Sequence, residues 1–220
     1  MGAPKETSLS EPEIGPEIPL RARKKLRTRK AISDAATDLF AERGFDAVTV
    51  EDVAEAAEVS KKTVFNYFGC KEDLLFDEAD AAKERLVAAV RERDPGESVL
   101  AAVRRNALAG TERMCSGEAP WIEKMSRLVA ASPSLQTRER EIYDDIARAL
   151  AEVIREETGA DEGDCRPYVA ARAMVGVQRS VIESARRRVV GGGQTGAELA
   201  KALRREVERG FAVLEEGLAH

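Results

Sequence analysis

A cluster of polar side chains in the first third of the chain has the chemistry to read DNA. Four of them fall within six residues, on a predicted short helix over 61–68: Lys61, Lys62, Thr63 and Asn66. In a major groove the Asn66 amide could pair with adenine, and Lys61 or Lys62 could reach guanine. Contact of either lysine with phosphate is an equally good interpretation. These residue types indicate nucleic-acid recognition.

A helix-turn-helix would hold these side chains at a groove. Such a motif needs a small residue where its two helices cross, and Ala54 supplies one. The apolar residues that could hold the crossing are Val53, Ala57, Val59, Val64 and Tyr67. Thr49, with Asp52 three residues on, has the pattern of a capping box for the first helix, and Ser60 is a plausible N-cap for the second. Any two short packed helices can give such a pattern.

The whole chain is predicted to be helical, with about nine helices and no sheet. No segment shows the sustained alternation of β-branched residues that a strand needs. Periodicity and helix breakers place the helices at about 28–43, 50–57, 61–68, 71–93, 97–115, 121–131, 134–157, 165–190 and 196–218. Residues 1–20 hold four of the eight prolines and little to bury, so a disordered tail is predicted there.

Charge is distributed unevenly along the 220 residues. The chain as a whole carries 35 Lys and Arg against 40 Asp and Glu, a net charge of −5 that by itself argues against a nucleic-acid partner. Residues 21–71, however, hold eleven basic and eight acidic side chains, a net +3, and seven of those cations crowd into residues 21–30. Such a block is typical of a basic arm or helix start that meets phosphate, and a merely solvated face is an equally good interpretation.

The sequence lacks the residues of the common catalytic and metal sites. Its single histidine is His220, which excludes Ser-His-Asp and Cys-His catalysis and any His-rich metal site. Cys70, Cys115 and Cys165 are spaced too widely for a disulfide framework or a CxxC zinc knuckle. No apolar run exceeds five residues, against about 20 for a membrane helix, and the polar N-terminus has no secretion signal. We therefore predict a cytoplasmic protein that is not an enzyme and binds no metal, cofactor or membrane.

A series of short motifs in residues 25–76 is specific enough to indicate a family. They are Ala36-x-x-Leu39-Phe40, Gly44-Phe45, Thr49-Val50, Val53-Ala54, Val59-Ser60, Thr63, Tyr67-Phe68 and Lys71-Glu72-x-Leu74. Because of these motifs, residues 25–76 closely resemble the DNA-binding domain of the TetR family of bacterial transcriptional regulators. The resemblance implies a three-helix helix-turn-helix domain with its basic arm over 21–76. A larger helical domain for ligand binding and dimerisation would follow over 77–220.

The resemblance also implies where DNA is contacted. The helix over 61–68 would be the recognition helix, and Thr49, Tyr67 and Lys71 would contact phosphates. With two residues of the basic arm included, the predicted DNA-binding set is Arg27, Thr28, Thr49, Lys61, Lys62, Thr63, Asn66, Tyr67 and Lys71. Three positions depart from the family's usual residues, and each bears on the operator sequence: they are Phe65 in place of tyrosine, and Glu58 and Lys62 in place of glycine.

The remaining two-thirds of the chain resembles the family only in its all-helical plan, which implies a homodimer and a small-molecule cavity. The predicted dimer-interface residues are Val169, Ala173, Val177, Val181, Leu203, Val207, Phe211 and Leu214. Packing of the last helix inside one chain is the alternative. Large, soft or amphipathic side chains suit a ligand site, although each is more often plain core. The candidates for the lining are Trp121, Met125, Leu128, Tyr143, Met174 and Gln178.

These features together predict a repressor that a small-molecule effector releases from double-stranded operator DNA. A DNA-binding regulator without a small-molecule inducer is the main alternative. A helical enzyme or ligand-binding protein is the third, and the lack of a usable histidine and of paired carboxylates argues against it.

Overall fold

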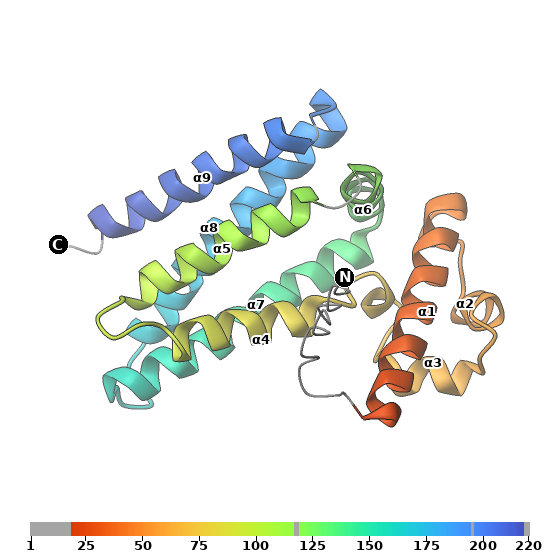
Figure 1. The fold of residues 1–220 in the computed structure, drawn as a ribbon, viewed down its shortest axis with the longest axis horizontal. Helices are drawn as coiled ribbons and strands as arrows, with labels where there is room; N and C mark the ends of the chain where they lie inside the picture. The colour runs from red at the N-terminus through yellow and green to blue at the C-terminus, as the bar shows by residue number, and fades with distance from the viewer. Residues whose placement is uncertain (1–18, 117–118, 195, 218–220) are drawn as a thin grey trace, which may run out of the picture.

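The computed structural model describes residues 19–116, 119–194 and 196–217. All regular structure within these ranges is helical, as the sequence predicted, and the α-helices there number nine (Figure 1). The predicted tail over 1–20 lies outside the described residues except for Pro19 and Leu20. No helix in the described part of the chain is both long and apolar enough to cross a membrane.

Three helices form the N-terminal part of the structure, which we call the head: α1 (Leu20–Arg43), α2 (Val50–Ala56) and α3 (Lys61–Tyr67). The predicted capping box opens α2, because the Thr49 hydroxyl accepts from the Asp52 amide and the Asp52 carboxylate accepts from the Thr49 amide at 2.7 Å. Ser60 opens α3 by accepting from the Thr63 amide at 3.0 Å. Local signals in the sequence therefore fix both helices of the helix-turn-helix.

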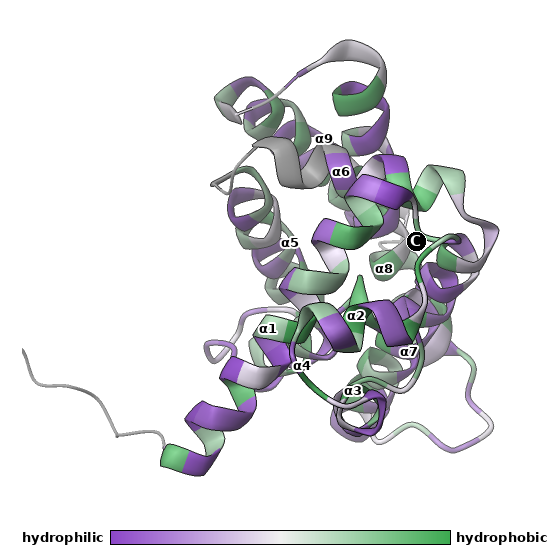
Figure 2. Cartoon of the chain, turned by 90° about the vertical axis from the view of Figure 1, so that its right-hand side faces the viewer, coloured by the Kyte–Doolittle hydropathy of each residue, from purple (hydrophilic) through white to green (hydrophobic). Residues whose placement is uncertain are grey.

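The first helix begins at Leu20, well before the start predicted near residue 28. Its first turns project from the rest of the chain (Figure 2). The cation-rich stretch offers no apolar periodicity, so the sequence gives no sign that it is helical. The helix ends at Gly44, whose φ of 81° suits a glycine. Between α2 and α3, Glu58 adopts a φ of 53°, a left-handed conformation that strains a non-glycine residue by about 1 kcal/mol.

The rest of the chain, which we call the body, is a bundle of longer helices. Its elements are η1 (Glu72–Leu74), α4 (Ala79–Arg91), α5 (Val99–Ser116), α6 (Ala119–Ala131), α7 (Pro133–Thr158), α8 (Arg166–Arg186), the π-helical turn η2 (Arg187–Gly191) and α9 (Gly196–Gly217). The single helix predicted over 71–93 is thus two elements with an irregular break after η1. Arg29 of α1 holds this break, since its guanidinium donates to the Asp77 carbonyl at 3.0 Å.

Two apolar clusters fill the structure, one in the body and one in the head. The head cluster contains side chains from all three head helices, such as Ile32, Val53 and Val64. It also contains three buried side chains that come from α6 and α7 of the body: Leu128, Val129 and Leu135. The apolar core of the head is therefore completed by residues that lie about sixty positions further along the chain.

Polar contacts join head and body beside this shared core. The Ser132 hydroxyl, between α6 and α7, donates to the Asp46 carboxylate at 3.2 Å. The Arg138 guanidinium of α7 donates to the Asp73 carboxylate of η1 at 2.8 Å. The first pair ties the loop after α1 of the head to the start of α7, and the second ties η1, the segment that follows the head, to the same end of α7. Together they fix the orientation of the head on the body.

Candidate DNA interface and ligand cavity

The recognition helix α3 exposes one polar face. Its side chains Lys61, Lys62, Phe65 and Asn66 are exposed, while Val64 and the following Phe68 are buried in the head. Within the described part of the chain, Lys62 and Asn66 have no hydrogen-bond or ion-pair partner. Both side chains are therefore free to bond with groups outside the protein, as base or phosphate contacts require.

Lys61 differs from its neighbour because it already has partners. Its ammonium pairs with the Glu51 carboxylate of α2 and lies 5.9 Å from the centre of the Phe65 ring. The hydrogen bond from Lys61 lowers the pKa of the Glu51 carboxyl. A DNA contact by Lys61 would have to compete with this exposed ion pair, whose free energy is small.

The two predicted threonine contacts differ in what their hydroxyls can still do. Thr49 Oγ1 donates its only hydrogen to the Asp52 carboxylate at 2.6 Å, so it has none left for a phosphate oxygen while the cap is intact. Thr63 Oγ1 lies 2.8 Å from Ser60 Oγ. Because the serine can donate in that pair, the Thr63 hydroxyl hydrogen remains available to DNA.

Lys71 is turned toward the protein. Its ammonium donates to the Phe45 carbonyl at 2.6 Å and lies 4.1 Å from the centre of the Phe45 ring. Burial lowers the pKa of this ammonium. The side chain therefore fastens the loop between α1 and α2, and a phosphate contact, which the resemblance implies, would use one of its remaining N–H donors.

Arg29 is a structural anchor that the sequence reasoning missed. Its guanidinium donates to the Tyr67 carbonyl at 2.7 Å and stacks 4.5 Å from the centre of the Phe68 ring, in addition to its bond with Asp77. It therefore ties α1 to the end of the recognition helix and to the start of the body. One signal could have found it: Arg29 lies three residues before Ile32 and seven before Ala36, on the buried stripe of α1. Among the predicted arm residues, Arg27 is exposed and Thr28 half-buried.

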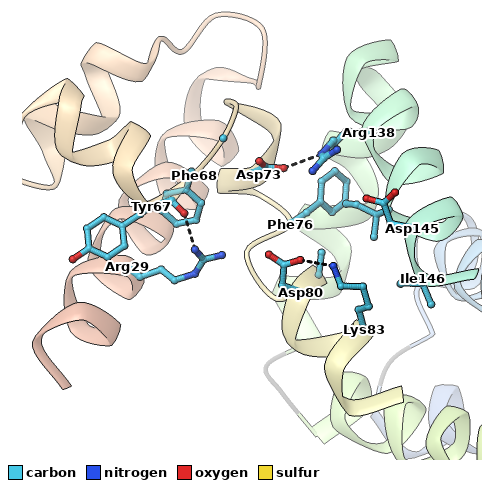
Figure 3. A pocket seen from close by; sticks show the side chains of 13 residues that line it. Arg29, Tyr67, Phe68, Asp73, Phe76, Asp80, Lys83, Arg138, Asp145 and Ile146 are labelled. Carbon is cyan, nitrogen blue, oxygen red and sulfur yellow. Dashed lines mark hydrogen bonds and ion pairs between the residues drawn. The ribbon is translucent and has the colours of Figure 1, made fainter. Parts of the chain in front are cut away.

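Arg29 lines a small cleft of about 110 Å³ between head and body. Figure 3 shows Arg29 reaching the backbone of Tyr67 on the head side, and Asp73 joined to Arg138 on the body side. Lys83 of α4 donates to Asp80 at 3.0 Å within the same cleft. The charged side chains of its wall all have partners within the protein, so we interpret this cleft as a joint between head and body.

A larger cavity of about 500 Å³ lies inside the body, between α4, α5, α6, α7 and α8. Of the predicted lining residues, Met125, Tyr143 and Gln178 do line it. Leu128 does not, because it points into the head cluster, and Met174 belongs to the body core. The side chain of Trp121 lies outside the described residues. Volume and lining suit a drug-sized molecule.

The predicted dimer residues divide into two groups. Val181, Leu203, Val207 and Phe211 are buried inside the chain, between 0% and 4% exposed, and of these four only Val181 borders the groove between α8 and α9. Ala173, Val177 and Leu214 line this shallow groove, joined by the 66%-exposed Val213, and Val169 of α8 is 58% exposed. The two helices approach closely here, since a β-carbon on Gly210 would lie 2.5 Å from Val177 Cγ1.

Comparison with known proteins finds matches to both parts of the chain. Residues 32–77 match the model described as bacterial regulatory proteins, tetR family, and residues 97–219 match the MftR C-terminal domain. The HTH-type transcriptional regulator TcmR of Streptomyces glaucescens is 32% identical over 168 residues, which is 74% of each chain. The putative mycofactocin biosynthesis transcriptional regulator MftR of Mycobacterium tuberculosis (strain ATCC 25618 / H37Rv) is 27% identical over 161 residues, 73% of this chain and 81% of that one.

The fold also matches solved structures. The solved structure of Thermus thermophilus FadR, a TetR-family transcriptional repressor in complex with lauroyl-CoA, superposes on this chain with a TM-score of 0.51 at 23% identity. The match covers 86% of this chain and 94% of that one. At this identity the likeness speaks for the fold alone.

Proposed function

The chain belongs to the TetR family of bacterial regulatory proteins and is a helix-turn-helix transcriptional regulator, and on that premise we propose that it is a repressor which a small molecule releases from its operator. One observation carries the proposal. Met125 and Ser126 of α6 line the cavity, whereas Leu128 and Val129 of the same helix pack into the head. A ligand that displaces α6 therefore displaces part of the head's core. We place this regulator in the cytoplasm and assign it no catalytic step.

Release by a small molecule requires that the ligand cavity and the DNA-binding surface affect each other's affinity to the same degree. An effector that weakens operator binding tenfold must itself bind the DNA complex about tenfold more weakly than the free protein. A gel shift on the DNA upstream of the chain's own gene, titrated with candidate small molecules, measures one side of this coupling. Effector binding with and without that DNA measures the other. An effector that binds both forms equally and still releases the DNA would contradict the coupling.

We expect Lys62→Ala to weaken operator binding and to make it less sensitive to salt. Lys62 is exposed on α3 and holds a charge with no partner in the described part of the chain. Loss of one phosphate contact lowers the slope of log K against log salt concentration by about 1. Fluorescence anisotropy with a labelled operator duplex gives this slope.

Lys201→Ala is the matched control, because Lys201 is an exposed lysine on α9 in the body. It should leave both affinity and slope at wild-type values. A Lys62→Ala variant that keeps the wild-type slope and the wild-type preference at every base pair would remove Lys62 from the interface.

We also propose that Phe65 contacts a thymine methyl group in the major groove. Its ring is 48% exposed on the same face of α3 as Lys62 and Asn66, and an apolar side chain there suits the C5-methyl of thymine. Phe65→Ala should weaken binding by about 1 kcal/mol at one T·A pair. Replacing that thymine by uracil, which lacks the methyl, should weaken wild-type binding equally and leave the variant unaffected. If the losses of binding free energy from Phe65→Ala and from the uracil substitution add up in the combined measurement, the ring and the methyl group are not in contact.

We further propose a homodimer formed by the parts of α8 and α9 that line their shared groove, which would set two recognition helices about 34 Å apart, one turn of DNA. Apolar, solvent-facing Val213 supports this surface. In analytical ultracentrifugation at micromolar concentration the wild type should sediment as a dimer, and Val213→Glu should raise the dimer dissociation constant at least tenfold. Leu26→Glu, at a 58%-exposed leucine on α1, is the control and should leave the dimer intact. A monomeric wild type would rule the dimer out.

A further inference from the structure

The wall of the body cavity specifies the chemistry of the molecule that fits it. Most of the lining is apolar and comes from five helices; examples are Leu86 of α4, Met114 of α5, Ile142 of α7 and Ile182 of α8. From the groups that interrupt this wall we infer that the effector is an uncharged, largely apolar molecule carrying a carbonyl or ether oxygen that accepts a hydrogen bond from Gln178. This inference rests on the proposed function and names the ligand class of its cavity.

The charged groups of the wall balance one another. The wall contains three acidic side chains, Asp77, Glu78 and Glu139, and three arginines, Arg85, Arg113 and Arg186. Arg186 of α8 is bonded to Glu139 of α7 through both of its terminal nitrogens, one at 2.7 Å, and both side chains are about four-fifths buried. Arg85 pairs with Glu78 at 3.3 Å at the exposed rim.

An anionic or cationic ligand would disturb this balance. A second charge beside the Glu139–Arg186 pair would have to separate the partners or remain uncompensated in a buried place, and either outcome is strongly unfavourable. The Asp77 carboxyl already has a partner inside the protein, because Ser33 bonds it, and burial raises its pKa. The cavity therefore favours an uncharged ligand.

Two neutral donors lie in the same wall. The side-chain amide nitrogen of Gln178 is buried and has no hydrogen-bond partner in the described part of the chain. Burial raises the pKa of the Tyr143 hydroxyl, so this group remains a neutral phenol that can donate. A buried donor without a partner is unfavourable, and a ligand oxygen would remove that penalty only while the ligand is bound. Gln178 thus selects for an acceptor.

Three related fluorescent probes test charge and hydrogen bonding separately in the full-length protein. N-phenyl-1-naphthylamine is neutral and has no carbonyl, 1-anilinonaphthalene-8-sulfonate is the same molecule with an added anion, and 6-propionyl-2-(dimethylamino)naphthalene is a neutral ketone. The neutral amine should bind at least tenfold more tightly than its sulfonate. Gln178→Leu should weaken binding of the ketone about tenfold, shift its emission to shorter wavelength, and leave the affinity of the amine unchanged.

Gln136→Leu is the control, because Gln136 of α7 bonds the Ala130 carbonyl away from the cavity; it should change none of these affinities. Thermal unfolding should show Gln178→Leu at least as stable as the wild type, and Gln178→Met provides a second variant without the donor. Equal or tighter binding of the sulfonate, or equal losses of ketone and amine in Gln178→Leu, would overturn the inference. None of these measurements involves DNA. A protein that binds the probes as expected, but that no bound small molecule releases from operator DNA, would contradict the proposed function and leave this inference standing.

Discussion

Leu128→Ala is expected to lower the free energy of unfolding by about 2–5 kcal/mol and to weaken operator binding about tenfold, although Leu128 lies in the body. Its side chain is buried in the head cluster, beside Val129 and Leu135. Truncation leaves a cavity beneath the helices that present α3, and the neighbouring side chains can close it only in part. Urea denaturation measures the first effect, and anisotropy with an operator duplex at 25 °C, where the variant is still folded, measures the second.

Leu108→Ala separates loss of stability from loss of binding. Leu108 of α5 packs against the body core and is not a member of the head cluster. Its truncation should destabilise the protein by a similar mechanism while leaving operator affinity of the folded protein near the wild-type value. If both variants bind DNA equally well, the shared core does not support the recognition helix in the way proposed.

Arg29→Met should lower the free energy of unfolding by about 3 kcal/mol. Methionine keeps an apolar stem of similar length but removes the donors to the Tyr67 and Asp77 carbonyls and the contact with the Phe68 ring. Two half-buried carbonyl groups then lose a charged partner, which is where most of the effect originates. Because Tyr67 ends α3, operator affinity should fall as well, and the transition measured by urea should broaden if the head loosens before the body.

Arg27→Met is the matched control on the same helix. Arg27 is exposed and its side chain has no hydrogen bond, ion pair or ring contact in the described part of the chain, so its loss should change stability by less than about 0.5 kcal/mol. A contact of the arm with phosphate would instead appear as a smaller salt slope in operator binding. Equal stability of the two variants would show that Arg29 does not anchor the head.

The helix-turn-helix could be predicted from sequence because its signals are local. Thr49 with Asp52, Ser60, and the break at Gly44 each act within one or two helical turns, and the structure has all of them. The start of α1 escaped detection for the opposite reason, since a run of cations carries no periodic apolar signal. The break after η1 escaped because a side chain from distant α1 holds it.

The cavity could be predicted only in part, because every helix of the body has several apolar residues. Which of them borders a void and which fills a core depends on how five helices pack. Met125 and Leu128 lie three residues apart on α6, yet Met125 lines the cavity at the edge of the head cluster whereas Leu128 is buried within that cluster. Gln178 was identifiable as the one amide on an apolar helix face, whereas the pairing of Glu139 with Arg186 joins positions 47 residues apart.

The sharing of head core with α6 and α7 limits how such a regulator can be rebuilt. A chimera that joins the head of one regulator to the body of another would give a known operator a new inducer. A cut after η1 would carry α3 into the chimera but leave Leu128, Val129 and Leu135 behind. The stability of the head in the hybrid would then depend on whether the foreign body has side chains of matching volume at those three positions. Compatibility between heads and bodies should therefore be judged by these buried positions, and transplanting them together with the head gives the exchange its best chance.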